Sequence, residues 1–325
     1  MMRNNTMRTV IAGISSHLPQ RVVTNDDLAQ MLDTSHEWIF SRTGIEQRRI
    51  SANNEFASDL GVIVAKKIIS QAGMDPEEID AIIVSTTTAD RRFPSCACRI
   101  QGEIGASRAF AFDINAACAG FIYGLSVSDS MMRMLGLKNV LLVTAETLTK
   151  FVDWTDRSTC VLFGDGAGAI LLQLSDDTSR GIISTKLYSN GEPEKYNSIL
   201  SHSGPQNGHR GYTTMAGRAV FKYAIEYMSS SMTSILSEND MTLDDIDWII
   251  PHQANKRILE SMCKMKDFPL EKVVITTQLH ANTSSASIPL ALKDMIDCGR
   301  IKQGDTLLFT ALGAGLVWGS SIVRL

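Results

Sequence analysis

The sequence predicts an α/β protein built from two similar halves, in which helices cover the faces of buried sheets. The chain has 325 residues, of which 44% are hydrophobic, and this suits one large globular domain or two closely packed ones. Apolar segments with strand character alternate with amphipathic helical segments, as they do in layered α/β folds. A pattern from the first part of the chain also returns in the second. Together these observations favour a duplicated α/β unit.

The repeated pattern has two parts that recur at almost the same spacing. GMDPEEIDAIIV at 73–84 matches DMTLDDIDWIIP at 240–251, which begins 167 residues further on. NVLLVTA at 139–145 matches DTLLFTA at 305–311, which begins 166 residues further on. Short apolar strands can match by chance, but the first pair also shares an acidic turn, and this favours duplication.

The helices around the repeat suggest where each half begins and ends. A long amphipathic helix is expected at 58–72 before the first copy and at 217–238 before the second. We therefore expect an N-terminal half at 1–175 and a C-terminal half at 176–325. Each half should consist of strands that alternate with helices.

The expected strands follow from runs of branched and aromatic residues. The first begins near Arg8, after a polar stretch at 1–6, and AFAFDI at 109–114 is expected to be a buried strand. The others lead from apolar runs into loops: IDAIIVSTTT, NVLLVTAE, AGAILLQL, WIIPHQAN, KVVITTQ and TLLFTALGAG. Polar residues at the ends of these strands are candidates for a site, because sites in such folds lie where strands end and loops begin.

Composition and charge argue against several classes of function. The formal charge of -4 disfavours a general nucleic-acid-binding protein, and no apolar run reaches the length of a membrane span. The first residues lack the small-residue cleavage site of a signal peptide. The six cysteines are scattered, which favours a reducing cytoplasm over a disulfide framework. Cys96 and Cys98 have no second pair nearby, so no metal site is expected.

Cys118 is the first candidate for chemistry. It lies in FDINAACAGFIYGLS at 112–126, where the strand AFAFDI leads into a segment with helical spacing of apolar residues. The positive end of a helix dipole and the unpaired backbone N–H groups there lower the pKa of a thiol, and the thiolate is the nucleophile. The alternative is a small buried side chain of the core.

Two further candidates also lie at strand-to-helix junctions. His252 directly follows the strand that ends at Pro251, and a helix is expected to begin near Ala254. Asn282 follows the expected strand KVVITTQ. Each has a plain alternative, since a histidine there can cap a helix or fill the core and an asparagine can cap a helix. However, Cys118 and Asn282 occupy equivalent places in the two halves, and a pseudo-two-fold axis would bring such places together.

The motifs around these three residues resemble those of the 3-oxoacyl-acyl-carrier-protein synthase III family, the initiating condensing enzymes of type II fatty acid synthesis. The resemblance covers nearly the whole chain from Met7 to Leu325. It implies the thiolase fold, with duplicated βαβαβαββ halves in an α-β-α-β-α arrangement, and a Cys118, His252 and Asn282 triad. The motifs are DTSHEWIFSRTGI (33–45), AACAGF (116–121), FGDGAGA (163–169), PHQAN (251–255), NTSSAS (282–287) and GAGLVWGS (313–320).

The resemblance implies two half-reactions. Cys118 takes an acyl group, acetyl by default, from acyl-CoA, and malonyl-acyl carrier protein then loses CO₂ and attacks the acyl-cysteine. His252 and Asn282 donate hydrogen bonds to the malonyl thioester oxygen. The backbone N–H groups of Cys118 and Ala314 form a second oxyanion hole. The chain departs from the family at Ala314 and at Ala281, where glycine is usual.

The resemblance also implies the binding residues and partners. No permanently bound cofactor is expected, and acyl-CoA is a substrate. The protein is expected to be a homodimer in which Phe93 closes the primer pocket of the partner. The CoA contacts would be Thr34, Trp38, Arg42, Arg157, Gly217, Phe221, Ala254 and Asn255. The carrier-protein contacts would be Arg218, Lys222, Lys256 and Arg257. Trp38 as a core aromatic, and these charges as ordinary surface, are the alternatives. Thr34 with Glu37 is expected to form a capping box.

Other functions are compatible with parts of this pattern. Papain-like proteases also run cysteine, histidine and asparagine in chain order, but their local sequence and export signal are missing here. A thiolase-fold acyltransferase of a polyketide or quinolone pathway would keep the same triad. A non-catalytic carrier-binding module would tolerate loss of the triad, which is intact. GDGAGA at 164–169 lacks the lysine of a P-loop and is expected to be a tight turn.

Overall fold

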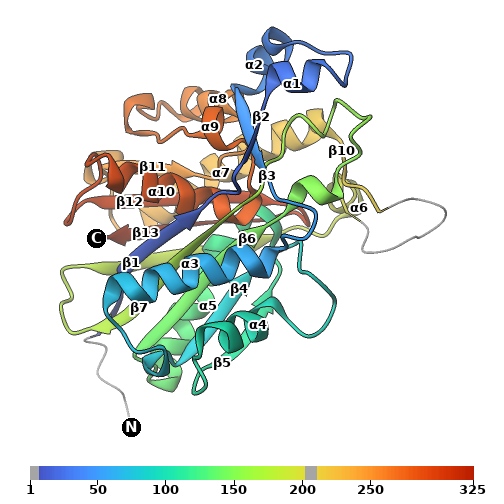
Figure 1. The fold of residues 1–325 in the computed structure, drawn as a ribbon. Coiled ribbons are helices and arrows are strands. Elements are labelled where there is room, and N and C mark those ends of the chain that lie inside the picture. The colour runs from blue at the N-terminus through green and yellow to red at the C-terminus, as the bar shows by residue number, and fades with distance from the viewer. Residues whose placement is uncertain (1–6, 202–210) are drawn as a thin grey trace.

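Two mixed sheets form the centre of the molecule (Figure 1), which a computed structural model describes at residues 7–201 and 211–325. The first sheet has the strand order β1-β7-β6-β4-β5, and the second has the order β11-β12-β13-β8. The first comprises β1 Arg8–His17, β4 Ala81–Ser85, β5 Phe110–Ile114, β6 Asn139–Glu146 and β7 Gly166–Ser175. The second comprises β8 Gly181–Ser189, β11 Trp248–Pro251, β12 Thr306–Gly313 and β13 Val317–Arg324.

Helices lie on both outer faces and between the sheets, which confirms the five-layer arrangement. The helices α3 and α4 cover the first sheet, α7 and α8 cover the second, and α5 and α10 lie between the two. Their bounds are α3 Ala57–Ala72, α4 Cys96–Ile104, α5 Gly120–Leu135, α7 Gly217–Glu238, α8 Lys256–Lys266 and α10 Ser287–Asp297. The apolar face of each outer helix packs on one sheet, whereas the middle pair packs on both.

The prediction of two similar halves is confirmed by the order of the elements. The first half runs β1-α3-β4-α4-β5-α5-β6-β7, and the second runs β8-α7-β11-α8-α10-β12-β13. The acidic turn of the repeat performs the same task in each half. Asp80 Oδ2 accepts hydrogen bonds from the backbone N–H groups of Lys138 and Asn139, and Asp247 Oδ2 accepts one from Thr306. Each carboxylate therefore ties the start of β4 or β11 to the start of β6 or β12.

One expected strand is absent among the described residues, and that prediction is wrong. KVVITTQ at 272–278 makes a single bridge to β11 and then enters the short helix α9, Thr277–His280. The buried amide of Gln253 explains this, because it donates to the carbonyl of Val274 and accepts from the N–H of Thr276. A side chain thus satisfies backbone groups that a strand would pair with its neighbour.

The strand β5 is an edge strand, so the prediction that AFAFDI is buried is also wrong. Phe110 is 40% exposed, and its ring stacks on that of Phe112 with centroids 6.4 Å apart. The pattern of apolar residues is the same for a central strand and for an edge strand that another surface covers. An exposed apolar edge is a ready site for pairing with another chain.

A small hairpin with two helices is inserted between β1 and α3 and lies beside α8 and α9 (Figure 1). It contains β2 Arg21–Thr24, α1 Asn25–Ala29, α2 His36–Thr43 and β3 Gln47–Ile50. The expected capping box is wrong by one residue, because Ser35, and not Thr34, accepts from Trp38 N–H at the start of α2. The short elements that remain are α6 Pro193–Tyr196, β9 Ile199–Leu200 and β10 Thr214–Met215.

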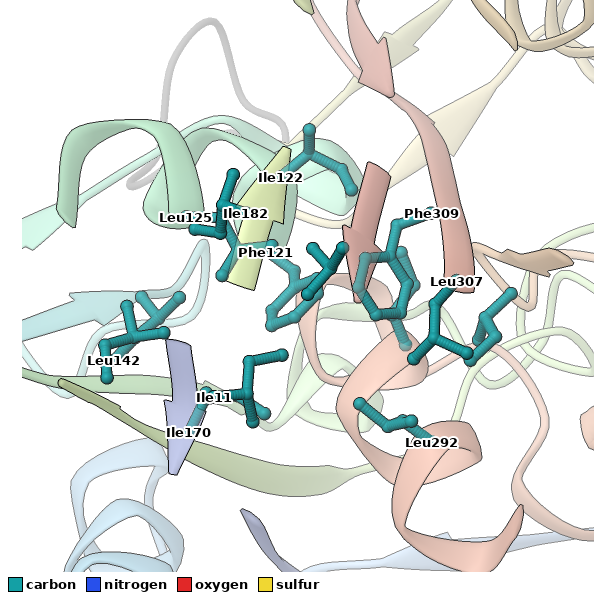
Figure 2. Close-up of a cluster of buried hydrophobic side chains, with 14 of the residues drawn as sticks. Ile11, Phe121, Ile122, Leu125, Leu142, Ile170, Ile182, Leu292, Leu307 and Phe309 are labelled. Carbon is teal, nitrogen blue, oxygen red and sulfur yellow. The ribbon is translucent and has the colours of Figure 1, made fainter. Parts of the chain in front are cut away.

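The core between the sheets fixes the helix that follows Cys118 (Figure 2). Phe121 on α5 meets Phe309 on β12 edge to face, with ring centroids 5.5 Å apart, and both side chains are fully buried. One residue earlier, a Cβ on Gly120 would lie 1.9 Å from Ser85 Oγ, so only glycine allows this close approach. Residues on both sides of the helix start therefore hold Cys118 in place.

Candidate active site

Cys118, His252 and Asn282 line one cavity of about 240 Å³. They come from the turn after β5, the end of β11 and the turn before α10, which are elements of both halves. The cavity also contains Ala314 and four of the residues expected to contact CoA: Gly217, Phe221, Ala254 and Asn255. Most of its wall is apolar, so water is largely excluded from the three polar groups.

The Cys118 thiol lies in a single 3-10 turn, Ala117–Ala119, directly before α5. The prediction of a lowered pKa is wrong, because burial raises the pKa of the Cys118 thiol to about 12. A hydrogen bond with the Ser284 side chain acts in the opposite direction, and the nearby carboxylate of Glu146 adds to the rise. The thiol is partly exposed, but it faces the apolar cavity, and the cost of placing a charge there exceeds the benefit of the helix N-terminus.

The high thiol pKa predicts how Cys118 reacts with iodoacetamide. A thiol with a pKa of about 12 is almost fully protonated at pH 7. Its thiolate fraction, and hence its alkylation rate, should rise about tenfold per pH unit from pH 6 to pH 9. Mass spectrometry of the alkylated peptide measures this rate. A rate that levels off below pH 8 would show that the thiol ionises near neutrality and would contradict the assignment.

His252 is held as a neutral hydrogen-bond donor. It is 2% exposed, and burial lowers its pKa to about 3. Its Nδ1 lies 2.7 Å from Ser287 Oγ, which also accepts a hydrogen bond from the backbone N–H of Gln253. The hydroxyl proton of Ser287 is therefore donated to Nδ1, and the ring proton resides on Nε2. An imidazole in this state can donate a hydrogen bond to a substrate oxygen.

Asn282 is anchored through every group except its amide nitrogen. Its backbone N–H donates to the Leu162 carbonyl, and its own carbonyl accepts from the N–H of Gly164. The side-chain Oδ1 accepts from the Ser284 N–H at 2.9 Å, as in a cap. This bond directs Nδ2 as the remaining donor, so the capping role and the predicted oxyanion role are compatible.

The end of β12 lies against the backbone of the nucleophile. A Cβ on Gly313 would lie 2.7 Å from Cys118 N and 3.0 Å from Ala116 O, which leaves no room for another residue. Ala314 follows directly and lines the cavity. Ala314 is not one of the described residues with a left-handed backbone, so its conformation suits alanine and the departure from the family's glycine causes no strain.

Replacing Gly313 by alanine is expected to slow the acylation of Cys118 by about 10²-fold, because the new methyl group displaces the Cys118 N–H from its position. Single-turnover loading followed by mass spectrometry measures the rate. Gly102→Ala on the open face of α4 is the control, since a Cβ there meets nothing within 4 Å. Equal loading rates for folded Gly313→Ala and the control would refute the role of this approach.

Backbone strain is concentrated at the two turns of the site. Ala117 and Ser284 have φ angles of 45° and 50°, and Ala281 has φ 57° with ψ -156°, a region that glycine normally occupies. These residues directly flank Cys118 and Asn282. The departure from glycine at Ala281 therefore affects backbone strain, and not only the loop freedom that the sequence suggests.

The aromatic and cationic residues of the expected CoA site gather on α2 and the loop at 153–160. The guanidinium of Arg42 lies 4.4 Å, and that of Arg157 5.0 Å, from the centroid of the Trp38 ring. Arg157 also pairs with Asp33 at 3.3 Å. A base between Trp38 and Arg157 needs two stacking distances of about 3.5 Å each, so the expected sandwich requires Arg157 to move away. Thr34 lies one residue from Asp33, with a buried hydroxyl that has no hydrogen-bond partner.

The basic residues expected to meet the carrier protein lie at the N-terminal ends of α7 and α8, which pack together. Arg218, Lys222 and Arg257 are exposed, whereas Lys256 is half-buried and pairs with Glu260 at 3.6 Å. Arg257 lies over the ring of Phe221, 5.9 Å from its centroid, and Phe221 lines the cavity. Phe93 lies elsewhere, 83% exposed in the loop before α4.

Several residues of the site carried no signal in the sequence. Ser284 contacts the thiol, Ser287 orients His252, and Thr87 and Thr88 line the cavity beside Cys118. Serine and threonine are common in loops, so only the fold distinguishes these from ordinary surface residues. Asn255 lines the cavity, as expected, and also caps α8 and donates to the Arg42 carbonyl.

The fold and the site together define a thiol-dependent condensing enzyme of the thiolase class. Among the described residues, no helix combines the length and hydropathy needed to cross a membrane. Models of 3-oxoacyl-[acyl-carrier-protein] synthase III and of its C-terminal part match residues 112–191 and 236–325. These matches cover both halves of the duplication.

Whole-chain relatives place the protein more narrowly. A beta-ketoacyl-[acyl-carrier-protein] synthase III of Ehrlichia canis is 48% identical, over 98% of this chain and 99% of that protein. The crystal structure of 3-oxoacyl-[acyl-carrier-protein] synthase III from Aquifex aeolicus is 42% identical, with a TM-score of 0.92 over 98% and 100% of the two chains. A priming beta-ketosynthase from the R1128 polyketide pathway is 33% identical, with a TM-score of 0.91 over 98% and 96%. The chain belongs to the beta-ketoacyl-[acyl-carrier-protein] synthase III family and is an acyl-transferring condensing enzyme of the initiating type.

Proposed function

We propose that this protein condenses an acyl group from acyl-CoA, acetyl by default, with malonyl-acyl carrier protein to give 3-oxoacyl-acyl carrier protein, CoA and CO₂. The observation that carries the proposal is the convergence of Cys118, His252 and Asn282 on one apolar cavity. A nucleophile and two neutral hydrogen-bond donors suit acyl transfer followed by decarboxylation. The family membership supports the same reaction.

The first half-reaction exchanges one thioester for another. Cys118 Sγ attacks the acyl-CoA carbonyl, the C–S bond to CoA breaks, and the proton that Cys118 loses is regained by the CoA sulfur. Because this exchange is neutral overall, a protonated resting thiol with a pKa of about 12 is compatible with it. The backbone N–H groups of Cys118 and Ala314 stabilise the oxyanion of the intermediate.

The second half-reaction needs donors that do not carry a charge themselves. Loss of CO₂ from the malonyl group leaves an enolate, whose oxygen accepts hydrogen bonds from His252 Nε2 and Asn282 Nδ2. The enolate carbon attacks the acyl carbonyl, and Cys118 leaves as a thiolate that takes one proton from solvent. A neutral His252 is useful here, because it does not protonate the enolate as readily as an imidazolium would.

Substrate binding divides between the mouth and the wall of the cavity. The adenine is proposed to bind between Trp38 and Arg157, the CoA phosphates near Arg42 and Thr34, and the pantetheine arm along the wall. Wall residues in this role are Gly217, Phe221, Ala254 and Asn255. The acidic carrier protein is proposed to dock on Arg218, Lys222, Lys256 and Arg257, which surround the same entrance. No permanently bound cofactor takes part.

The proposal includes a homodimer built on the β5 edge. Exposed Phe110 and Phe93 would then be covered, and Phe93 would close the primer pocket of the partner subunit. The two halves are proposed to be 1–175 and 176–325, joined between β7 and β8. Six free cysteines, one of them the nucleophile, suit a reducing cytoplasm.

Replacing Phe110 by aspartate is expected to convert the dimer to monomers, since it buries a charge in an apolar edge. Analytical ultracentrifugation over a concentration series measures this. Met265→Asp, on an exposed position of α8, is the control and should remain dimeric. A monomeric native protein, or a dimer that the Phe110 change leaves intact, would contradict the β5 interface.

A polyketide-type acyltransferase is the second candidate, because the R1128 priming ketosynthase shares the fold across nearly the whole chain. A condensation assay separates the two. The native protein is mixed with malonyl-acyl carrier protein and a panel of acyl-CoAs, and the carrier-bound product is weighed by mass spectrometry. Formation of 3-oxobutanoyl carrier protein from acetyl-CoA supports fatty acid initiation. Activity only with longer or unusual primers, or with another acceptor, would favour the second candidate.

A further inference from the structure

A buried carboxylate lies at the end of β6, beside the site but outside the proposed chemistry. Glu146 is the last residue of β6 and has no exposed surface. Its Oε2 accepts hydrogen bonds from the Thr87 N–H at 3.1 Å, the Thr87 hydroxyl at 3.0 Å and the Thr88 hydroxyl at 2.9 Å. Its Oε1 accepts from the Ser285 hydroxyl at 2.8 Å. Burying a carboxylate is costly, and these donors offset much of that cost.

The partners of Glu146 belong to two different parts of the site. Thr87 and Thr88 follow β4 and line the cavity beside Cys118. Ser285 lies in the 3-10 turn Ser284–Ala286, directly after Asn282. One carboxylate therefore connects the wall of the acyl cavity to the turn that presents Asn282.

The duplication shows what this position does in the other half. At the repeat spacing of 167 residues seen between Met74 and Met241, Cys118 is equivalent to Ser285 and Glu146 is equivalent to Gly313. The 3-10 turn of each half lies against the long strand of the other: the Cys118 turn contacts β12, and the Ser285 turn contacts β6. Gly313 supports the Cys118 turn by close approach, and Glu146 supports the Ser285 turn by hydrogen bonds.

We propose that Glu146 is a positioning residue for the condensation step, which holds the Asn282 turn at a fixed distance from the acyl group on Cys118. This inference rests on the proposed function. It separates the supports of the two half-reactions: Gly313 orders the Cys118 backbone for acylation, and Glu146 orders Asn282 for decarboxylation. Asn282 needs such a support because its turn includes strained backbone at Ala281 and Ser284.

Ser285→Ala removes only the connection to the Asn282 turn and leaves Thr87 and Thr88 bonded to Glu146. We expect decarboxylation of malonyl-carrier protein to fall about tenfold, the loss typical of one hydrogen bond to a charged group. Acylation of Cys118 should stay within about twofold, because its own support at Gly313 is intact. A uniform structural loss would instead slow both half-reactions equally.

Glu146→Ala should slow decarboxylation at least as much as Ser285→Ala, and adding Ser285→Ala to it should have no further effect, because the connection is already cut. Glu146→Gln preserves the size of the side chain and some of its hydrogen bonds, so it should recover part of the decarboxylation rate if Glu146→Ala folds poorly. Asp80→Asn is the control, since Asp80 joins the opposite ends of β4 and β6. That control should alter stability and leave the ratio of the two rates unchanged.

The experiment measures both rates separately, by single-turnover loading from acetyl-CoA and by CO₂ release from malonyl-carrier protein. The inference is overturned if Ser285→Ala leaves decarboxylation unchanged, lowers both rates equally, or adds fully to the effect of Glu146→Ala. Failure of the native protein to load or to decarboxylate would instead refute the proposed function. The two failures are therefore distinguishable.

Discussion

Serine in place of Cys118 is expected to abolish acyl transfer while leaving the fold intact. A hydroxyl is a much weaker nucleophile than a thiol, and nothing beside Cys118 is a base that could activate it, because His252 carries its proton on Nε2. The turn tolerates the change, since the equivalent position of the second half is Ser285. Release of free CoA in a single turnover measures the loss.

Cys298→Ser is the matched control for this prediction. Cys298 is exposed and follows α10, away from the cavity, so its replacement should leave CoA release unchanged. Thermal unfolding of both variants checks that each is folded. Release of CoA by a folded Cys118→Ser protein at a rate near that of the native enzyme would show that another group is the nucleophile.

Alanine at His252 or at Asn282 is expected to separate the two half-reactions. Either change removes one donor to the malonyl thioester oxygen, and loss of one such donor typically costs about 10²–10³ in rate. Acylation of Cys118 should continue, because its oxyanion hole consists of backbone N–H groups. Loading from acetyl-CoA and CO₂ release from malonyl-carrier protein are measured on the same preparations.

Asn239→Ala provides the control for these variants, since Asn239 ends α7 and donates only to the Ile235 carbonyl. It should retain both rates. Rapid decarboxylation by the Asn282 variant would remove Asn282 from the mechanism. Loss of acylation in the His252 variant would show that His252 acts in the first half-reaction as well.

Much of the fold could be predicted from local patterns. The long helices α3 and α7, the strands β4, β6, β7, β11 and β12, and the duplication are all visible as apolar periodicity. The errors arise where distant residues decide. The side chain of Gln253 replaces a strand partner at 274–276, and the sheet order leaves β5 at an edge. Neither effect has a signature in the segment concerned.

The candidate site could be predicted only as far as its chemistry depends on residue type and place. Cys118, His252 and Asn282 lie at strand ends, and the structure brings them to one cavity. The ionisation of the thiol could not be predicted, because it depends on the apolar wall and on Glu146 more than on the helix that follows. Ser287 and Glu146 act through contacts across 35 and 139 residues of sequence, which only the folded chain reveals.

The measurement that tests the central claim most directly is intact-mass spectrometry after the native protein has been mixed with a panel of acyl-CoAs, followed by peptide mapping. A single acyl adduct on the peptide that contains Cys118 is the expected result, and the most rapidly loaded chain identifies the primer. Folded protein that forms no adduct with any acyl-CoA, or forms one on another residue, would contradict acyl transfer through Cys118.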